Sequence, residues 1–521
     1  MRTSLSLIGL GAILTSVVAQ RVVPLSFSRA GPEHKSLRKR AGTYSQELNN
    51  NLTGGGYYAQ VALGSPPQPV TLVLDTGSSD VWVLDANANL CQSRSLQDLY
   101  GSCLATYEPA DSSTYKLVDP DAFQIQYLDG SGAEGDYIKD TFHIGGTSIK
   151  ALQVGLAENS SINSGLLGIG FNANVAADKP YPNIIDLFVN QDLIDIKAYS
   201  LYLNDLAAET GTILFGGLDT KKFIGQLKVV DILPDVHSQT YSSFTVALES
   251  LKISSGSSSE GLDLLDEETP VILDSGTTLT YLPPRVARRI YKSFNAVDDT
   301  SVTGLVYVSC DLLSSAKDTT VDFRLGGPNG PLIRVPIDEI VLDNLKGYMS
   351  LGLALPDLPF DDVCSFGIQS LSGIYLLGDT FLRSAYVVYD LSNRKIALAQ
   401  ANVNATETNI MEITASGIPI VSGVPAQQTP KTSSHSDSTD KSGTSTETTD
   451  QATDQTTDQA TNQATDQATG GATNQATGGA AGGAASDSAA LRAVPTLNWE
   501  AVAVTLVATL LGLVGAGLFA F

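Results

Sequence analysis

Two short stretches of the chain place an acidic residue between an apolar run and a glycine turn. VTLVLDTGSSDVWV begins at Val70 and VILDSGTTLTYLP begins at Val271, so the acidic residues are Asp75 and Asp274. Asp is a poor strand former, and a buried carboxylate costs free energy unless it is paired or hydrogen-bonded. Because the pattern occurs twice, we expect the two carboxylates to act together.

Two carboxylates held close together favour chemistry on a water molecule. They cannot both ionise cheaply, so one keeps a proton while the other is charged, and the pair titrates as a unit. The charged group can take a proton from water, and the protonated group can polarise a peptide carbonyl. This chemistry needs no metal and no cofactor.

The residues beside each Asp suit such a pair. Gly77 and Gly276 allow the two backbones to approach closely. Neighbouring hydroxyls are expected to bond the outer carboxylate oxygens (Ser78, Thr277) or to tie one loop to the other (Thr76, Ser275).

Other hydrolytic chemistries find little support. Between residues 41 and 402 the only histidines are His143 and His237, and no His-Glu-x-x-His motif for zinc occurs. No Gly-x-Ser-x-Gly elbow and no phosphate-binding glycine loop is present. Of the hydrolytic chemistries considered, the sequence therefore favours a pair of carboxylates.

The central region that must position the pair is predicted to be mostly β. From Tyr44 to about Ala401, short runs rich in Val, Ile, Leu, Tyr and Thr alternate with Gly, Asn, Asp and Pro turns. Few helical segments are expected, and the sequence favours them at Asn183–Asn190 and Pro284–Phe294. This length favours two lobes, and the Leu-Leu-Gly segments near Leu166 and Leu376 repeat after the two Asp motifs, as in a duplicated β unit.

The two motifs, DTGSSDVWV and DSGTT, each followed by a Leu-Leu-Gly segment, resemble those of the pepsin-like aspartic proteases over residues 57–399. The resemblance implies a bilobal acid protease fold with two duplicated β lobes and a flap hairpin. It assigns catalysis to Asp75 and Asp274, the flap tyrosine to Tyr127 and its hydrogen-bond partner to Trp82. Substrate-binding positions implied in the two loops are Gly77, Ser78, Gly276, Thr277 and Thr278. Leu128 departs from the family pattern, because Gly commonly follows the flap tyrosine.

Asp129 and Gly130 on the expected flap resemble the Asp-Gly of fungal yapsin-like and secreted candidal enzymes. Such an Asp would favour a Lys or Arg side chain in the substrate through charge pairing. An exposed turn Asp without this role is an equal alternative. The acidic loop Ser257–Thr269 would add negative charge beside the cleft or serve only as a solvated insertion.

The four cysteines indicate two disulfides in a secreted chain, for which three pairings exist. Proximity in sequence favours Cys91–Cys103 and Cys310–Cys364. Acceptor motifs for N-glycosylation occur at Asn51, Asn159 and Asn404.

The chain begins with the pattern of a secretory signal peptide, and a basic segment follows that ends in Arg38-Lys39-Arg40. We expect cleavage after Arg40 by a Lys-Arg-specific convertase. The basic propeptide could then bind an acidic cleft.

The other end predicts a surface tether. Gln427–Ala490 is rich in Thr, Ala, Asp, Gln, Gly and Ser and cannot pack a core. Small residues, a spacer and the uncharged run Ala501–Phe521 favour a glycosylphosphatidylinositol (GPI) signal over a tail-anchored helix. The preferred attachment residue is Ser488, with Ser486 and Asp487 as alternatives.

The formal charge of −24 and pI near 4.4 argue against nucleic-acid binding and suit an acidic exterior. The predicted layout is a signal peptide (1–19), a propeptide (20–40), a bilobal domain (41–402, lobes 57–215 and 216–402), a disordered stalk (403–490) and a GPI signal (491–521).

The prediction is a monomeric, secreted, GPI-anchored aspartic endopeptidase acting on polypeptides at the cell surface. Its partners would be these substrates, the membrane through the lipid, and cell-wall glucan. The alternative is a catalytically silent wall mannoprotein on the same fold, although silencing usually replaces an Asp or its Gly.

Overall fold

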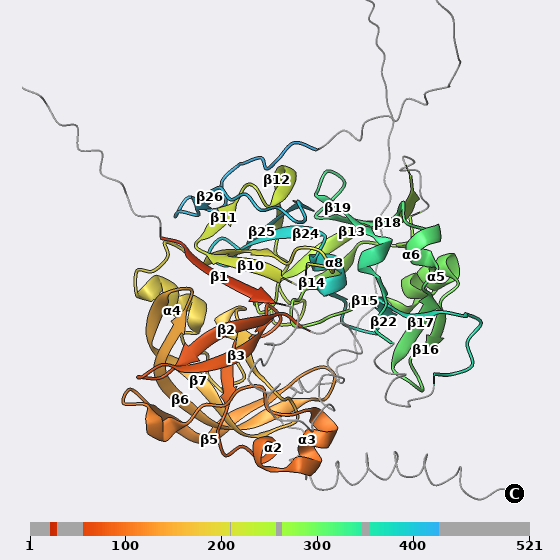
Figure 1. Ribbon diagram of the computed structural model, residues 1–521. Helices are drawn as coiled ribbons and strands as arrows, with labels where there is room; N and C mark the ends of the chain where they lie inside the picture. The colour runs from red at the N-terminus through yellow and green to blue at the C-terminus, as the bar shows by residue number, and fades with distance from the viewer. Residues whose placement is uncertain (1–20, 29–55, 209, 257–262, 346–354, 427–521) are drawn as a thin grey trace, which may run out of the picture. The chain divides into compact units, whose positions relative to one another are not determined.

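The structure is a computed structural model that describes residues 21–28, 56–208, 210–256, 263–345 and 355–426, all within the first of two compact units, Met1–Lys431 (Figure 1). Several predicted features lie outside these residues: the signal peptide, Arg40, Asn51, residues 486–488 and the hydrophobic tail. In the described part of the chain, no helix is long and apolar enough to cross a membrane.

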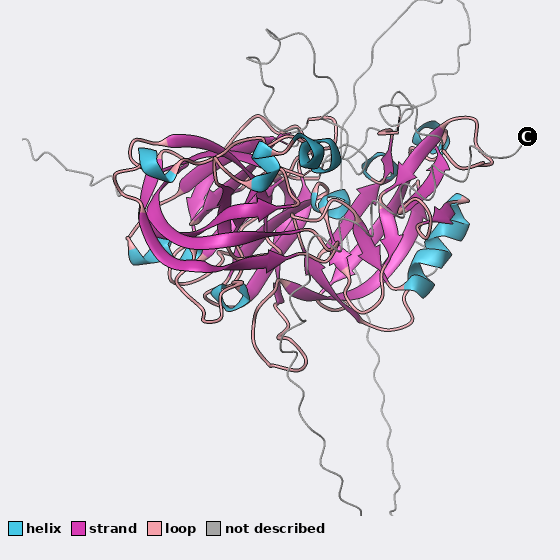
Figure 2. Ribbon diagram, turned by 90° about the horizontal axis from the view of Figure 1, so that it is seen from below, coloured by secondary structure: helices cyan, strands magenta, loops and turns pink. Residues whose placement is uncertain are grey.

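Strands dominate the described residues, and the helices are short and lie around the sheets (Figure 2). The mostly β prediction is therefore confirmed. The α-helices are α2 (Asn89–Gln92), α3 (Arg94–Tyr100), α4 (Ile184–Asn190), α5 (Pro284–Phe294), α6 (Leu312–Ser315) and α8 (Asp379–Leu382). Short 3-10 turns occupy Pro109–Asp111, Asn172–Asn174 and Ile337–Glu339.

The two predicted helices are α4 and α5. Helix α5 has the predicted bounds and begins on a proline, where the missing N–H costs nothing. Asn183 is the N-cap of α4 and forms a capping box with Asp186, so the helix proper begins one residue later than predicted.

The largest sheet has thirteen strands and continues from the first half of the chain into the second. Its spatial order is β12 (Phe223–Asp231), β25 (Lys395–Ala401), β24 (Ala385–Asp390), β9 (Ala198–Tyr202), β10 (Thr210–Phe215), β1 (Val23–Ser28), β2 (Tyr58–Leu63), β3 (Gln68–Asp75), β8 (Gly165–Gly168), β4 (Val81–Leu84), β7 (Thr147–Ser160), β6 (Gly132–Ile144) and β5 (Lys116–Gln126). Strands β24 and β25, near the end of the fold, lie beside β9 and β12, as the cyan and yellow ribbons of Figure 1 show.

The rest of the second half forms two further sheets. The seven-stranded sheet has the order β19 (Leu332–Pro336), β18 (Thr319–Leu325), β13 (Thr245–Ser255), β14 (Thr269–Leu273), β23 (Leu376–Leu377), β15 (Thr280–Leu282) and β22 (Ile368–Ser370). The four-stranded sheet has the order β16 (Val297–Asp299), β17 (Leu305–Ser309), β21 (Val363–Phe366) and β20 (Val341–Leu342). One buried apolar cluster runs through both halves.

Strand β1 comes from the predicted propeptide and lies between β10 and β2. Its side chains Val23 and Leu25 are buried. This part of the segment belongs to the central sheet.

The predicted start of the stalk at residue 403 is wrong. Strand β26 (Ile410–Glu412) pairs with β11 (Gly217–Asp219), and Ile413 is fully buried. The run NIMEITASGIPIV carries enough apolar residues to cover a sheet face, and Ile413, Ile418 and Val421 pack in one apolar cluster.

The predicted disulfides Cys91–Cys103 and Cys310–Cys364 are both present. Asn159 and Asn404 are exposed. The side-chain amide of Asn404 donates a hydrogen bond to Asp205, which would compete with glycan attachment there.

Candidate active site

Each candidate aspartate stands where a strand ends beside a parallel Leu-Leu-Gly strand. Strand β3 ends on Asp75, which is level with Gly168 of β8. Strand β14 ends immediately before Asp274 and runs parallel to β23. A Cβ on Gly168 would lie 2.5 Å from the Asp80 carbonyl oxygen, and one on Gly378 would lie 2.2 Å from that of Thr277. The glycine of each Leu-Leu-Gly segment is therefore needed where the backbone passes under the aspartate loop.

The two loops approach so closely that each glycine faces the opposite carboxylate. A Cβ on Gly77 would lie 2.5 Å from Asp274 Oδ1, and a Cβ on Gly276 would lie 2.3 Å from Asp75 Oδ1. Real side chains do not tolerate such contacts. The carboxylates themselves are buried, with exposed fractions of 4% for Asp75 and 8% for Asp274.

Each carboxylate accepts two hydrogen bonds from its own loop. The Gly77 N–H donates to Asp75 Oδ1 over 2.7 Å, and the Gly276 N–H donates to Asp274 Oδ1 over 2.9 Å. The hydroxyl of Ser78 donates to Asp75 Oδ2, and that of Thr277 donates to Asp274 Oδ2. The hydroxyl contacts predicted from the sequence are confirmed, and they leave the two Oδ1 atoms on the side where the loops meet.

Hydroxyls also cross between the loops, as predicted. The Thr76 N–H donates to Ser275 Oγ (3.2 Å), and the Ser275 N–H donates to Thr76 Oγ1 (2.9 Å). Each hydroxyl then donates to a backbone carbonyl of the other half, at Leu273 and Leu74. Four buried bonds fix the separation of the carboxylates.

The pair is built to hold a proton. Burial raises the pKa of Asp75 to about 7; the nearby charge of Asp274 acts in the same direction, and the bonds from Ser78 and Gly77 oppose both. A neutral carboxylic acid and a carboxylate therefore coexist in mildly acidic solution.

We expect the free energy of unfolding to fall as the pH rises from about 4 to about 7. Asp75 keeps a proton in the folded protein up to about pH 7, whereas an unfolded Asp releases it near 3.8. Between about pH 4 and pH 7 the folded state binds more protons than the unfolded state. The stabilisation from the Asp75 proton is therefore fully present below this range and is lost as the pH rises through it, by at most about 1.4 kcal/mol per pH unit for one group. Melting temperatures measured by scanning calorimetry at one-unit intervals would show the trend.

The control for this pH dependence is Asp75→Asn, which stays neutral throughout. Its melting temperature should depend less on pH than that of the parent. A melting temperature that does not change with pH in the parent, or that changes equally in parent and variant, would contradict the shared proton.

A third buried aspartate was not identified from the sequence. Asp80 is fully buried and accepts hydrogen bonds from the hydroxyls of Tyr137 (3.1 Å) and Tyr181 and from the Ala176 N–H (2.7 Å). Burial raises its pKa. Asp80 thereby attaches the segment after β8 to the Asp75 loop. The sequence indicates this residue only as another acidic residue next to an apolar run, Val81–Leu84.

The β5–β6 hairpin carries Tyr127 beside the site. The indole N–H of Trp82 donates to Tyr127 Oη over 2.9 Å, as predicted. Burial raises the pKa of Tyr127, and the charge of Asp75 adds to this. Tyr127 therefore stays a neutral hydroxyl close enough to sense the Asp75 charge.

The hairpin turn is ordered despite Leu128. The Tyr127 N–H donates to the Ser131 carbonyl (2.8 Å), and Gly130 adopts φ 84°, which suits glycine. Leu128 is 68% exposed, so its side chain meets no steric obstacle. Asp129 is exposed and accepts from the N–H and the hydroxyl of Ser131 through Oδ1.

The charge of Asp129 also reaches the second half of the chain. Tyr281 of β15 has a raised pKa, mainly through burial and then through the charge of Asp129.

Thr278, in the second loop, accepts a hydrogen bond from the Thr380 N–H through its carbonyl and has a half-buried side chain.

One group of possible metal ligands occurs among the described residues: Cys310, Asp343 and Cys364. Both cysteine sulfurs are joined in a disulfide, so the group offers a single carboxylate. It lacks the ligands that a metal ion needs.

Comparison with known proteins gave consistent matches. The family model described as eukaryotic aspartyl protease matches residues 56–401. The probable aspartic-type endopeptidase opsB of Aspergillus oryzae is 42% identical over 386 residues, which cover 72% of this chain and 74% of that relative. Secreted aspartic protease 4 of Candida albicans is 35% identical over 376 residues, 72% of this chain and 82% of that relative.

A solved structure shares the fold. The aspartic proteinase from Irpex lacteus superposes with a TM-score of 0.53 at 20% sequence identity, over 74% of this chain and 99% of that one. The predicted bilobal β fold is consistent with this likeness.

Proposed function

This chain belongs to the eukaryotic aspartyl protease family and is an aspartic-type endopeptidase that acts on polypeptides, and we propose that Asp75 and Asp274 are its catalytic pair. The observation that carries this proposal is the reciprocal fit in which each loop glycine faces the opposite carboxylate. Acid-pH hydrolysis that pepstatin inhibits, and that processed Asp75→Asn protein lacks, tests it.

The pair acts on a water molecule held between the two Oδ1 atoms. The ionised carboxylate takes a proton from this water while the water oxygen attacks the peptide carbonyl carbon. The protonated carboxyl group gives its proton to the carbonyl oxygen. The carboxyl group that took the water proton then gives it to the leaving nitrogen, the other carboxylate takes the proton of a diol hydroxyl, and the C–N bond breaks to leave a carboxylic acid and an amine. No covalent intermediate with the protein forms, and the fixed loops supply the orientation.

The flap completes this site. Tyr127, held by Trp82, lies over the Asp75 side and can exclude bulk water from the reacting bond. Leu128 and Asp129 at the turn are the flap side chains that a bound peptide would meet first.

We further propose a preference for Lys or Arg in the substrate, set by Asp129. Its Oδ1 is used by Ser131, while Oδ2 accepts no hydrogen bond from a described residue. A cationic substrate group could bind there. In the acidic loop, the charge of Asp266 is already matched by Arg289 (2.7 Å) and Arg285 (3.6 Å) of α5.

Asp129→Asn should lower the selectivity for a Lys peptide over its norleucine analogue about 5- to 10-fold, the effect of one charge-assisted contact. The ratio of kcat/KM for the two peptides measures it. Asp119→Asn is the matched control, since Asp119 is exposed on the same hairpin but farther from the turn. Equal selectivity in both variants would leave Asp129 as a plain turn residue.

We propose that the protein is secreted, yapsin-like and anchored at the plasma membrane by GPI, and that it is a monomer. The apolar N-terminal segment and the relative named as a secreted aspartic protease support secretion. The small residues at 486–488 followed by the uncharged Ala501–Phe521 support the anchor.

Phosphatidylinositol-specific phospholipase C should release most of the protease activity from washed intact cells. A lipid-held protein loses its anchor when the phosphodiester is cut, whereas a tail-anchored helix is unaffected. Immunoblots of cells and supernatant give the released fraction. A chain truncated after residue 485 should appear in the medium without enzyme treatment, and a fraction released only by glucanase would indicate linkage to wall glucan.

A further inference from the structure

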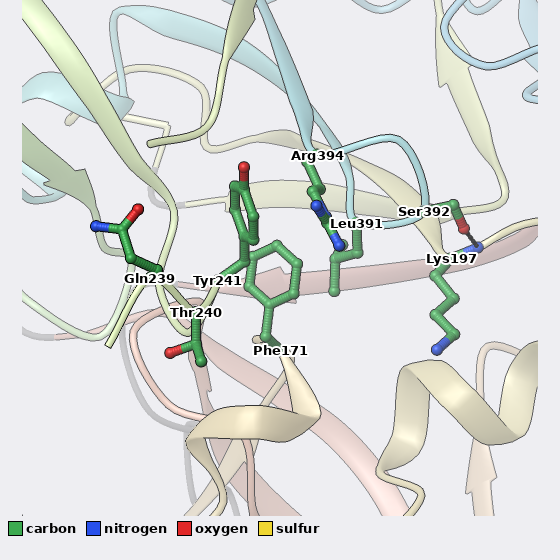
Figure 3. Close-up of a pocket in the computed structure, with 8 residues that line it drawn as sticks. All are labelled: Phe171, Lys197, Gln239, Thr240, Tyr241, Leu391, Ser392 and Arg394. Carbon is green, nitrogen blue, oxygen red and sulfur yellow. Dashed lines mark hydrogen bonds between the residues drawn. The ribbon is translucent and has the colours of Figure 1, made fainter. Parts of the chain in front are cut away.

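A pocket of about 610 Å³ is lined by segments from both halves of the chain, and none of its lining residues belongs to the two aspartate loops. Figure 3 shows Phe171, Tyr241 and Leu391 forming its apolar part, with Arg394 beside the Tyr241 ring and Lys197 at the other end. Its volume falls in the range of small-molecule sites. The catalytic proposal gives this pocket no role.

The two cations in the pocket differ in their partners. Lys197 Nζ lies 2.5 Å from Asp186 Oδ1, so its charge is already matched. The guanidinium carbon of Arg394 lies 4.2 Å from the centre of the Tyr241 ring, and Arg394 has no ion pair with any described residue. Arg394 is exposed, so its guanidinium lies on the Tyr241 ring with no described carboxylate to neutralise it.

Arg394 also occupies an unfavourable backbone position. Its φ is 57°, in the left-handed region that Gly and Asn adopt more easily. It lies in the turn between β24 and β25, where Asp390 accepts from both the N–H and the side chain of Asn393. Gln239, on the opposite wall, also has φ 57°. Eight non-glycine residues of the described chain have a positive φ, and two of them line this pocket.

We propose that this pocket binds an organic carboxylate that carries an apolar group. The planar guanidinium of Arg394 suits the two oxygens of a carboxylate, and Phe171, Tyr241 and Leu391 suit the apolar part. The Ser392 hydroxyl accepts from the Lys197 N–H (3.0 Å) and can direct its own hydrogen to an anion. A dianionic phosphate fits less well, since only one of the two cations is unmatched.

Isothermal titration at pH 6 would test the proposal on the processed protein saturated with pepstatin, which occupies the cleft. N-acetyl-L-phenylalanine should bind with Kd ~0.1–1 mM, in keeping with its size. Its amide lacks the charge and acetate lacks the apolar group, so both should bind at least about 10-fold more weakly.

The matched variants are Arg394→Asn and Lys197→Gln. Arg394→Asn should weaken binding of the acid at least about 10-fold without lowering Tm, because Asn accepts the left-handed conformation. Lys197→Gln should change it less than about 3-fold, since Lys197 is neutralised by Asp186. Equal binding of the amide or of acetate, or unchanged binding in Arg394→Asn, would overturn the proposal whatever the outcome for Asp75 and Asp274.

Discussion

Replacing Asp75 by Asn is expected to lower kcat/KM for peptide hydrolysis at acid pH by about 10⁴-fold, the scale seen when a member of an interdependent catalytic group is removed. An amide at this position can neither take the proton of the attacking water nor deliver one to the carbonyl oxygen. Asp274→Asn should have an equally large effect, because the carboxylates share one proton. Hydrolysis of a fluorogenic peptide by protein beginning near residue 41 measures both.

The appropriate control is Asp98→Asn, since Asp98 is exposed on α3. It makes the same chemical change away from the site and should keep parental activity. Far-ultraviolet circular dichroism should show that Asp75→Asn remains folded, because the Asn oxygen still accepts from the Gly77 N–H and the Asn NH2 group can donate to the Ser78 hydroxyl. A folded variant that retains more than about 1% of the pepstatin-sensitive rate would exclude Asp75 as a catalytic group.

The aspartate loops could be predicted because their requirements are local. Each needs an apolar strand, an Asp, a glycine and a hydroxyl within a few residues, and all of these adjoin in the sequence. Only one long-range fact, that the two loops meet, had to be supplied by the repeated pattern. Asp80 shows the kind of site residue that the sequence does not predict. Its partners Tyr137 and Tyr181 come from distant segments, and nothing in its own surroundings indicates two tyrosine hydroxyls.

The end of the fold was misplaced for a related reason. The short apolar run at Ile410–Ile413 adjoins a long polar stalk, and its partner strand β11 lies far back in the sequence. A three-residue strand carries little periodicity of its own. The continuous thirteen-stranded sheet likewise depends on β24 pairing with β9, a contact between the two predicted lobes that no local signal specifies.

Loss of the Arg383 side chain is expected to destabilise the protein by about 3–5 kcal/mol in Arg383→Met, the usual cost of leaving one member of a buried ion pair alone. Arg383 is 1% exposed. Its Nε donates to the Glu339 carboxylate, and its Nη2 donates to the Glu339 carbonyl over 2.7 Å. Urea unfolding at pH 5, followed by tryptophan fluorescence, gives the free energy.

Two variants separate a buried charge from mere loss of a contact. Arg383→Met/Glu339→Gln removes both charges, and Gln can still accept from the Leu206 N–H as Glu339 does over 3.0 Å, so more than half of the lost stability should return. Lys395→Met breaks an exposed pair with Asp231 and should cost about 0.5 kcal/mol or less. If Arg383→Met costs no more than Lys395→Met, the Arg383–Glu339 pair does not stabilise the fold. If the predicted difference appears, Glu339, which also accepts from the Leu206 N–H, is a charged link between the first and second halves of the chain.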